Sequence, residues 1–188
     1  MTVLLHMSMS LDGYVAGPDV SADQGMGAGG ERLHDWMFAE PVAEADRAMQ
    51  DRIRADVGAV VVGRRTFDVG LPHWQDVPFP APTFVVTHEA RAELAQPSGT
   101  FTFVVDGVAK AVELAAARAG GRKVVLMGAD VDQQALRAGL VDEVLINHVP
   151  VLLGGGTRLF DATPAAELVP FEVVASPAVT HIRYRVVR

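Results

Sequence analysis

The segment Gly63-Arg64-Arg65-Thr66 carries the residue types best suited to binding an anion. It follows a short apolar run, Val57 to Val62, which is typical of a buried parallel strand. A glycine at a strand end, followed by two guanidinium groups and a hydroxyl at a helix start, suits a phosphate group. The free N–H groups of a helix N-terminus and the arginine side chains all donate hydrogen bonds to phosphate oxygens. The alternative is a turn beside two solvated arginines.

Two other strand ends carry residues of similar character. Thr87 ends a predicted strand that begins at Thr83, and His88 follows it. Because ligands of an open parallel sheet bind outside the carboxyl ends of the strands, we expect Thr87 and His88 to lie beside the first segment, although both also suit ordinary helix caps. Gly128-Ala129 separates a strand from a helix, where small residues let the helix N-terminus approach a pyrophosphate, but it falls short of a G-x-G-x-x-G motif.

A turn and a glycine run mark two further candidate positions. The Asp12-Gly13 step directly follows a predicted strand, Val3 to Ser10, and suits a turn in which the carboxylate bonds its own downstream backbone. Three glycines, Gly154 to Gly156, follow an apolar run from Glu143 to Leu153 that Pro150 must bulge or end. Their backbone lets a flat ligand approach closely, or simply forms a flexible turn.

The bulk composition excludes several classes of function. A chain of 188 residues with a formal charge of −7 fits one domain and offers no basic stripe for nucleic acid or an anionic membrane surface. The chain has no cysteine, and its six histidines share no metal-ligand spacing, so we expect no metal site. No apolar run approaches the ~20 residues that a membrane helix needs. The first ten residues do not resemble a signal peptide, so we expect a cytoplasmic protein.

Strands and helices must alternate to position these residues. We predict a long irregular loop over Ala16 to Gly30, which at such a length is a lid or disordered. Helices are predicted over Trp36 to Arg54 and Gly107 to Ala119, and a proline-rich connection over Leu71 to Pro82. The chain should close with an antiparallel hairpin of Phe171 to Ala175 and Val179 to Val187, joined by Ser-Pro-Ala.

The order of these segments resembles the dihydrofolate reductase superfamily. The segments that carry the resemblance are SMSLDGYVAG, VVVGRRTFD, FVVTH, VVLMGA and LVDEVLINHVPVLLGGGTRLF. They are most similar to the branch that contains the C-terminal reductase domain of the bifunctional riboflavin-biosynthesis deaminase/reductase. The resemblance covers nearly the whole chain. It implies an α/β fold of a single domain over residues 1–188, with a three-layer α/β/α arrangement, a mostly parallel central sheet and an antiparallel C-terminal edge.

The resemblance also implies NADPH as cofactor and assigns site residues by position. The positions implied to bind the cofactor are Val15, Ala16, Gly17, Gly63, Arg64, Arg65, Thr66, Thr87, His88, Gly128, Ala129, Gly154 and Gly155. Ser10 and Asn147 would face the substrate, and Asp12 would anchor it or relay a proton, unless it only forms the turn. Dihydrofolate reductases also carry a substrate-binding carboxylate on the first helix. The corresponding region here contains Glu44 and Asp46 without a clear positional match.

We therefore expect an NADPH-dependent reductase that passes hydride to a C=N or C=O bond of a small pteridine- or aminopyrimidine-like substrate. The alternative is a nucleotide-binding module without turnover. A content of 49% hydrophobic residues and a mean hydropathy of +0.22 favour a homodimer that covers an apolar C-terminal edge; the alternative is a helix of the same subunit. The residues expected on that edge are Val144, Ile146, Phe171, Val173, Val179 and Ile182.

Overall fold

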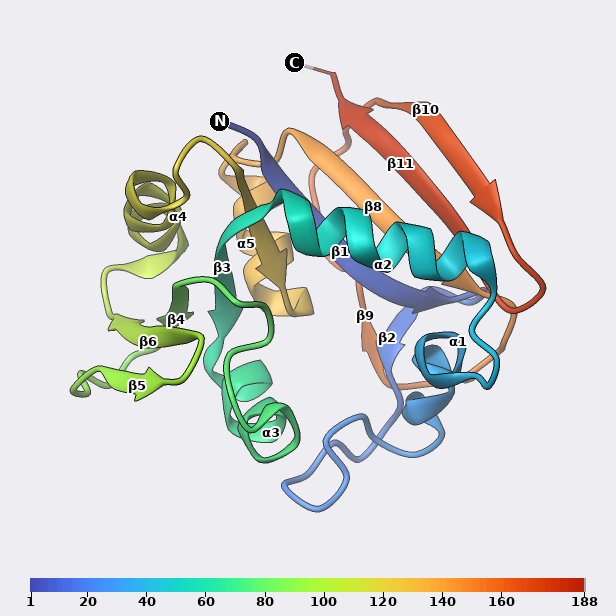
Figure 1. Cartoon of the computed structure of the whole chain (residues 1–188), viewed down its shortest axis with the longest axis horizontal. Coiled ribbons are helices and arrows are strands. Elements are labelled where there is room, and N and C mark those ends of the chain that lie inside the picture. The colour runs from blue at the N-terminus through green and yellow to red at the C-terminus, as the bar shows by residue number, and fades with distance from the viewer. Residues whose placement is uncertain (188) are drawn as a thin grey trace.

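The computed structural model describes residues 1–187, which form a nine-stranded sheet between helices on both faces (Figure 1). The strand order is β10-β11-β8-β1-β7-β3-β4-β6-β5. The strands are β1 (Val3–Ser10), β3 (Val57–Gly63), β4 (Thr83–Val86), β5 (Leu94–Gln96), β6 (Gly99–Val104), β7 (Lys123–Met127), β8 (Glu143–Val149), β10 (Leu168–Ala175) and β11 (Thr180–Val186). A separate two-stranded sheet joins β2 (Tyr14–Ala16) to β9 (Thr157–Arg158).

The sheet is parallel in its interior and antiparallel at both edges. Strands β8, β1, β7, β3, β4 and β6 run parallel to one another. The hairpin of β10 and β11 adds the antiparallel edge that the sequence predicts. Strand β5 adds a second antiparallel edge, which the sequence analysis did not foresee. The predicted mostly parallel α/β sheet is thus confirmed.

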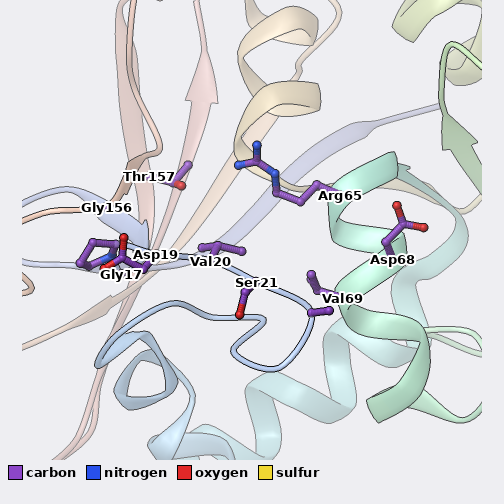
Figure 2. A pocket seen from close by; sticks show the side chains of 11 residues that line it. Gly17, Asp19, Val20, Ser21, Arg65, Asp68, Val69, Gly156 and Thr157 are labelled. Atoms are coloured by element: carbon purple, nitrogen blue, oxygen red, sulfur yellow. The ribbon is translucent and has the colours of Figure 1, made fainter.

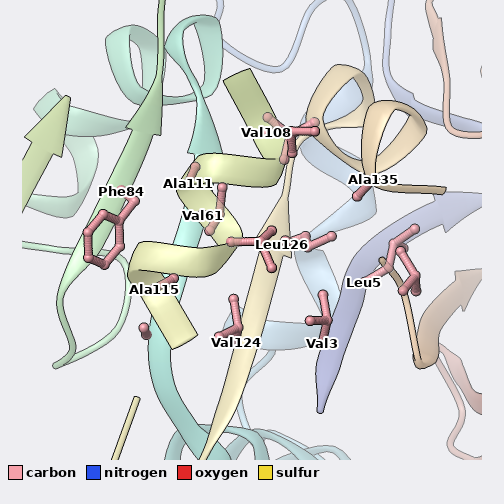
Figure 3. Packing of buried hydrophobic residues seen from close by; sticks show 14 of the residues in the cluster. Val3, Leu5, Val61, Phe84, Val108, Ala111, Ala115, Val124, Leu126 and Ala135 are labelled. Carbon is pink, nitrogen blue, oxygen red and sulfur yellow. The ribbon is translucent and has the colours of Figure 1, made fainter. Parts of the chain in front are cut away.

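The apolar strands are explained by helices on both sides of the sheet. Strand β3 alternates its side chains, so that Val60 faces one apolar cluster and Val61 the other. Helices α2 (Glu44–Asp56) and α3 (Arg64–Trp74) cover the first face with residues such as Met49 and Phe67. Helices α4 (Gly107–Arg118) and α5 (Ala129–Arg137) cover the second, where Figure 3 shows α4 lying across β3 and β7.

Two helix predictions need correction, both at prolines. The predicted helix over Trp36 to Arg54 is divided into α1 (Asp35–Phe38) and α2, because Pro41 lacks an N–H group and disfavours helix at the residue before it. A short 3-10 helix, η1 (Gly30–Leu33), precedes α1. The predicted connection from Leu71 instead begins inside α3, which continues past Pro72 to Trp74 because the Trp74 ring stacks on Phe101 at 6.4 Å.

The apolar residues of the C-terminal edge divide into buried and exposed groups. Val144, Ile146 and Val179 are at most 4% exposed and belong to the monomer's own core, so their predicted place on an outer face is wrong. Phe171 and Val173 on β10 are 38% and 61% exposed. Between residues 1 and 187, no helix is both long and apolar enough to cross a membrane.

Candidate functional site

A large cleft opens at the carboxyl ends of the central strands and extends between α2 and α3. Its volume is about 1520 Å³. Pockets for single drug-sized ligands typically measure roughly 300–1,000 Å³. The cleft therefore has room for a dinucleotide and a second small molecule side by side. Its position agrees with the general rule for ligands of open parallel sheets.

The cleft brings together most of the residues predicted from the sequence. Those that line it are Val15, Ala16, Gly63, Arg64, Arg65, Thr66, Thr87, His88, Gly128, Ala129 and Asn147. Ser10, Asp12, Gly154 and Gly155 do not line it, and Gly17 lines a smaller pocket beside it. The roles predicted for all of these residues stay predictions. The residues that line the cleft lie within reach of one common ligand, whereas the others lie outside its reach.

Two helix N-termini meet at one end of the cleft. Helix α3 begins after Gly63 and α5 begins after Gly128, and both glycines line the cleft. Gly128 has a φ of +110°, and a Cβ atom there would lie 2.4 Å from Thr66 Oγ1. Only glycine permits this approach, which sets the two helix starts side by side. Their free N–H groups suit the paired phosphates of a dinucleotide.

Arg64 is already engaged by carboxylates at this end. Its Nε donates to both Asp68 oxygens at 2.8 and 2.9 Å, and its Nη1 donates to Glu89 at 3.1 Å. The hydrogen bond to Asp68, and then the one to Glu89, raise the pKa of Arg64 above its usual value. A phosphate that binds Nη1 of Arg64 must therefore compete with the Glu89 carboxylate, whose side chain is 75% exposed. Nothing in the residues next to Arg64 in the sequence predicts the contact with Glu89, which lies 25 positions later.

The smaller pocket, of about 600 Å³, lies between α3 and the start of the predicted long loop. Figure 2 shows Arg65 extending from α3 in the direction of Thr157. Arg65 and Thr157 also line the cleft, so the two spaces adjoin. A Cβ atom on Gly156 would lie 2.1 Å from the Ala16 carbonyl oxygen. This third glycine therefore packs backbone against backbone, whereas nothing lies within 4 Å of a Cβ on Gly155.

The Asp12 carboxylate holds the glycine run in place. It accepts hydrogen bonds from Ser10 Oγ at 2.6 Å, from the Gly154 N–H at 2.7 Å and from the Leu153 N–H at 3.2 Å. The Ser10 hydrogen bond, with the backbone donors, lowers the pKa of Asp12 to about 2. An ionised carboxylate outside the cleft favours the structural turn, and the catalytic role of Asp12 stays a prediction.

The other end of the cleft contains residues that the sequence analysis did not select. His6 and Ser8 on β1, with His34 and Trp36, line it beside Asn147. Asn147 Nδ2 lies 2.9 Å from His6 Nε2 and 3.4 Å from Ser8 Oγ. Burial lowers the pKa of His6 to about 4, so its ring is neutral at pH 7. In the sequence, this end of the cleft is indicated only by His6 and Ser8, two polar residues that interrupt the otherwise apolar strand β1.

Asp46 is one of the two acidic residues considered as a match for the substrate-binding carboxylate of dihydrofolate reductases. It lies on α2 but is 1% exposed and does not line the cleft. Its carboxylate instead faces His181 Nε2 on β11 at 3.0 Å and accepts a hydrogen bond from Ser176 Oγ at 3.0 Å. The chain therefore has a carboxylate on the helix where dihydrofolate reductases carry their substrate-binding one, but His181 and Ser176 contact this carboxylate in place of a substrate.

Residues 1–187 contain no group of three acidic or histidine side chains that could hold a metal ion. The family model for the RibD C-terminal domain matches residues 1–180. No curated protein matches the sequence significantly.

Solved structures are similar in fold. A candidate riboflavin biosynthesis protein from Shewanella sp. PV-4 is 22% identical, with all of both chains covered and a TM-score of 0.75. A deaminase/reductase from Thermotoga maritima is 16% identical at a TM-score of 0.64, with 99% of this chain and 56% of that one covered. Dihydrofolate reductase from Enterococcus faecalis, complexed with NADP(H), is 13% identical at a TM-score of 0.56, with 98% and 96% covered. These likenesses confirm the dihydrofolate reductase-like fold.

Proposed function

Because the chain belongs to the RibD C-terminal domain family, we propose that it is an NADPH-dependent reductase acting on a C=N or C=O bond of a small heterocyclic substrate. A pteridine- or aminopyrimidine-like ring has the flat shape and polar edge that such a cleft accommodates. The observation that carries the proposal is the single cleft that joins two helix N-termini to an apolar end with a few polar side chains. The family is reductase-like, and hydride transfer to a small ring is the simplest reaction that such a cleft supports.

The protein's own residues have three tasks in this proposal. The starts of α3 and α5, with Arg64 and Arg65, would hold the cofactor phosphates. The bound nicotinamide would supply the hydride. Val15 and Ala16 would flank the ring, while the apolar wall would exclude water from the transfer. His6 would orient the accepting bond by hydrogen bonding, and Asn147 would hold the His6 ring in place.

A nucleotide-binding module without turnover is the second candidate. One observation favours it: neither Asp12, considered as a proton relay, nor Asp46, considered as a substrate-binding carboxylate, lines the cleft, and both are engaged elsewhere. Such a module would still bind NADPH. It would differ from the reductase only in having no substrate that accepts the hydride.

Two measurements distinguish these functions. NADPH is titrated into the protein by fluorescence, and its absorbance is then followed with pteridines, aminopyrimidines and simple carbonyl compounds. Binding followed by substrate-dependent oxidation of NADPH supports the reductase. Binding without turnover across the panel supports the module, and the absence of NADPH binding contradicts both. An Arg64→Ala/Arg65→Ala double variant controls for binding at the proposed phosphate end.

We also propose that the enzyme is a cytoplasmic homodimer. The support for the dimer is strand β10, which ends the sheet and exposes Val169, Phe171 and Val173. Pairing across a two-fold axis would cover both the strand edge and these side chains. Cell fractionation tests the compartment, and light scattering tests the assembly.

A further inference from the structure

A chain of buried polar side chains leads from α2 to the cleft. His181 is 0% exposed, with Nε2 at 3.0 Å from Asp46 Oδ1 and Nδ1 at 2.8 Å from Asn147 Oδ1. The Asn147 amide continues to His6, which lines the cleft. Both ring nitrogens of His181 thus face oxygen atoms. A neutral imidazole donates from only one nitrogen, so this arrangement needs one more proton than a carboxylate beside a neutral ring provides.

The Asn147 amide is the element that this proton controls. With its oxygen toward His181, its NH₂ group donates to His6 Nε2 and toward Ser8 Oγ. Turned by half a rotation, the amide would donate to His181 and accept from His6 instead. The two orientations differ by one proton in the buried network. They also place the single proton of neutral His6 on opposite ring nitrogens.

Burial favours the orientation that retains the proton. An ionised Asp46 beside a neutral His181 would leave a net negative charge in a region where both side chains are at most 2% exposed. The neighbouring cations do not offset it freely, because Arg52 pairs with Glu172 at 2.7 Å and Arg183 pairs with Glu143 at 2.8 Å and with Glu172 at 3.3 Å. Burial lowers the pKa of His181, and the hydrogen bond to Asp46 opposes that shift only in part. The retained proton is called for by the geometry, because oxygen atoms face both ring nitrogens of His181.

We propose that Asp46 and His181 hold one proton in common and thereby lock the Asn147 amide with its NH₂ group toward His6 and Ser8. The substrate end of the cleft is then a donor surface. His6 Nε2 accepts from Asn147, so its proton is on Nδ1, which has no hydrogen-bond partner within residues 1–187. A neutral imidazole N–H can polarise a carbonyl in this way. The surface selects an acceptor group, such as a carbonyl oxygen or an unprotonated ring nitrogen.

The selection of an acceptor group rests on the proposed reductase function, whereas the position of the protons does not. Nitrogen-15 NMR of the histidine rings in the unliganded protein at pH 7 therefore tests the network without any substrate. We expect Nδ1 of His181 and Nδ1 of His6 to be protonated and Nε2 of His6 to be unprotonated. A proton on His6 Nε2, or none on His181 Nδ1, overturns the proposal whether or not the protein is a reductase.

Three variants extend the test. His181→Phe keeps a ring against Trp36, 5.0 Å away, but removes the donor to Asn147. It should abolish the single His6 tautomer and raise the substrate KM roughly tenfold, with NADPH affinity unchanged. Asp46→Asn should preserve the wild-type tautomer and KM, because its amide can donate to His181 as a protonated carboxyl does. The control, Glu44→Gln, alters an exposed carboxylate on the same helix.

The variants also separate a positioning role from simple support of the fold. If Asp46→Asn moves the His6 proton to Nε2, the shared proton does not set the amide and the proposal fails. If His181→Phe lowers kcat with no change in KM or tautomer, the network does not define the donor surface. Should His181→Phe fail to fold, the unmodified protein and Asp46→Asn still decide the matter. If NADPH is not oxidised with any substrate, the reductase proposal fails while the ring NMR stands.

Discussion

Arg64 is bound on both sides by carboxylates before any cofactor arrives, and this bears on cofactor choice. We predict a preference for NADPH over NADH, because Arg64, Arg65 and His88 line the same end of the cleft. Removing both arginines should narrow the affinity gap by roughly 10- to 150-fold, as expected from losing a charge-assisted hydrogen bond. Glu89→Gln should widen the gap, because the 2′-phosphate no longer competes with a carboxylate.

Fluorescence titration with both cofactors at fixed ionic strength checks this preference, since salt screens the exposed charges. Glu93→Gln, which alters another exposed carboxylate that Arg64 does not contact, serves as the control. Equal affinities of the unmodified protein for NADPH and NADH would contradict the prediction.

Asp12 offers a second test at the residue scale. Asp12→Asn places an amide NH₂ group where the carboxylate accepts from Ser10 and the backbone of Leu153 and Gly154. We expect a melting temperature lower by a few degrees and unchanged turnover well below it. Asp161→Asn, in an exposed loop, is the control. Lower turnover at an unchanged melting temperature would restore the catalytic role predicted from the sequence.

The residues that the sequence predicted best are those that act through their backbone or that lie at strand ends. Gly63 and Gly128 were found because glycines between a strand and a helix have few other uses. His181 could not be found, because nothing local marks a histidine on an edge hairpin as the partner of an aspartate 135 positions earlier. Burial and long-range pairing, rather than residue type, give that pair its role.

Helix α5 contains an unusual buried acid, Asp132. It is 0% exposed, and neither carboxyl oxygen has a hydrogen-bond partner among the described residues. Burial raises its pKa well above the usual value, so the folded protein binds this proton more tightly than the unfolded chain. Stability from this group is therefore full below about pH 3.9 and declines as the pH rises toward the folded pKa.

Asp132→Asn should remove the decline in stability that this carboxyl group causes as the pH rises. Between about pH 4 and the folded pKa, the unmodified protein should lose roughly 1.4 kcal/mol of unfolding free energy per pH unit from this group. The variant should match it near pH 4 and exceed it at pH 8, as measured by urea denaturation across the pH range. Asp130→Asn, an exposed neighbour on the same helix, is the control. Parallel pH curves for the unmodified protein and Asp132→Asn would refute the assignment.

The glycine run separates two roles within three residues. Gly156→Ala should lower the unfolding free energy by roughly 1–3 kcal/mol, because its φ of +119° is strained for alanine and the added Cβ meets the Ala16 carbonyl. Gly155→Ala, with open space around the Cβ, should be tolerated. Thermal melting of both variants compares them directly. Similar losses at the two positions would show that close backbone packing does not distinguish them.

At the element scale, the sequence predicted the type of most elements but misplaced ends set by tertiary contacts. The apolar run of β3 and the final hairpin are confirmed. The end of α3 was wrong, because packing of Trp74 outweighs the usual effect of Pro72. Strand β9 was missed, because two residues paired with Tyr14–Ala16 carry no periodic signal of their own.

For the whole molecule, we predict a homodimer that pairs through strand β10. Light scattering at micromolar concentration should give twice the 20.0 kDa mass of the chain. Val173→Arg, at a position 61% exposed, should reduce this to the monomer mass by placing a charge in the apolar contact. Leu152→Arg, at a position 66% exposed outside β10, is the control. A monomer mass for the unmodified protein, unchanged on concentration, would contradict the dimer.

The central place of β1 also sets the order in which the chain can fold during synthesis. Strand β1 lies between β7 and β8, so Ser8 must wait for Asn147, 139 residues later in the chain. At ~5–20 residues per second, the ribosome needs roughly 7–28 s to make that stretch. Strands β3 and β4 can pair long before then. The apolar N-terminal strand therefore lacks β8 throughout this interval and lacks β7 until Met127 is made, so we expect nascent chains to aggregate more readily than the finished protein.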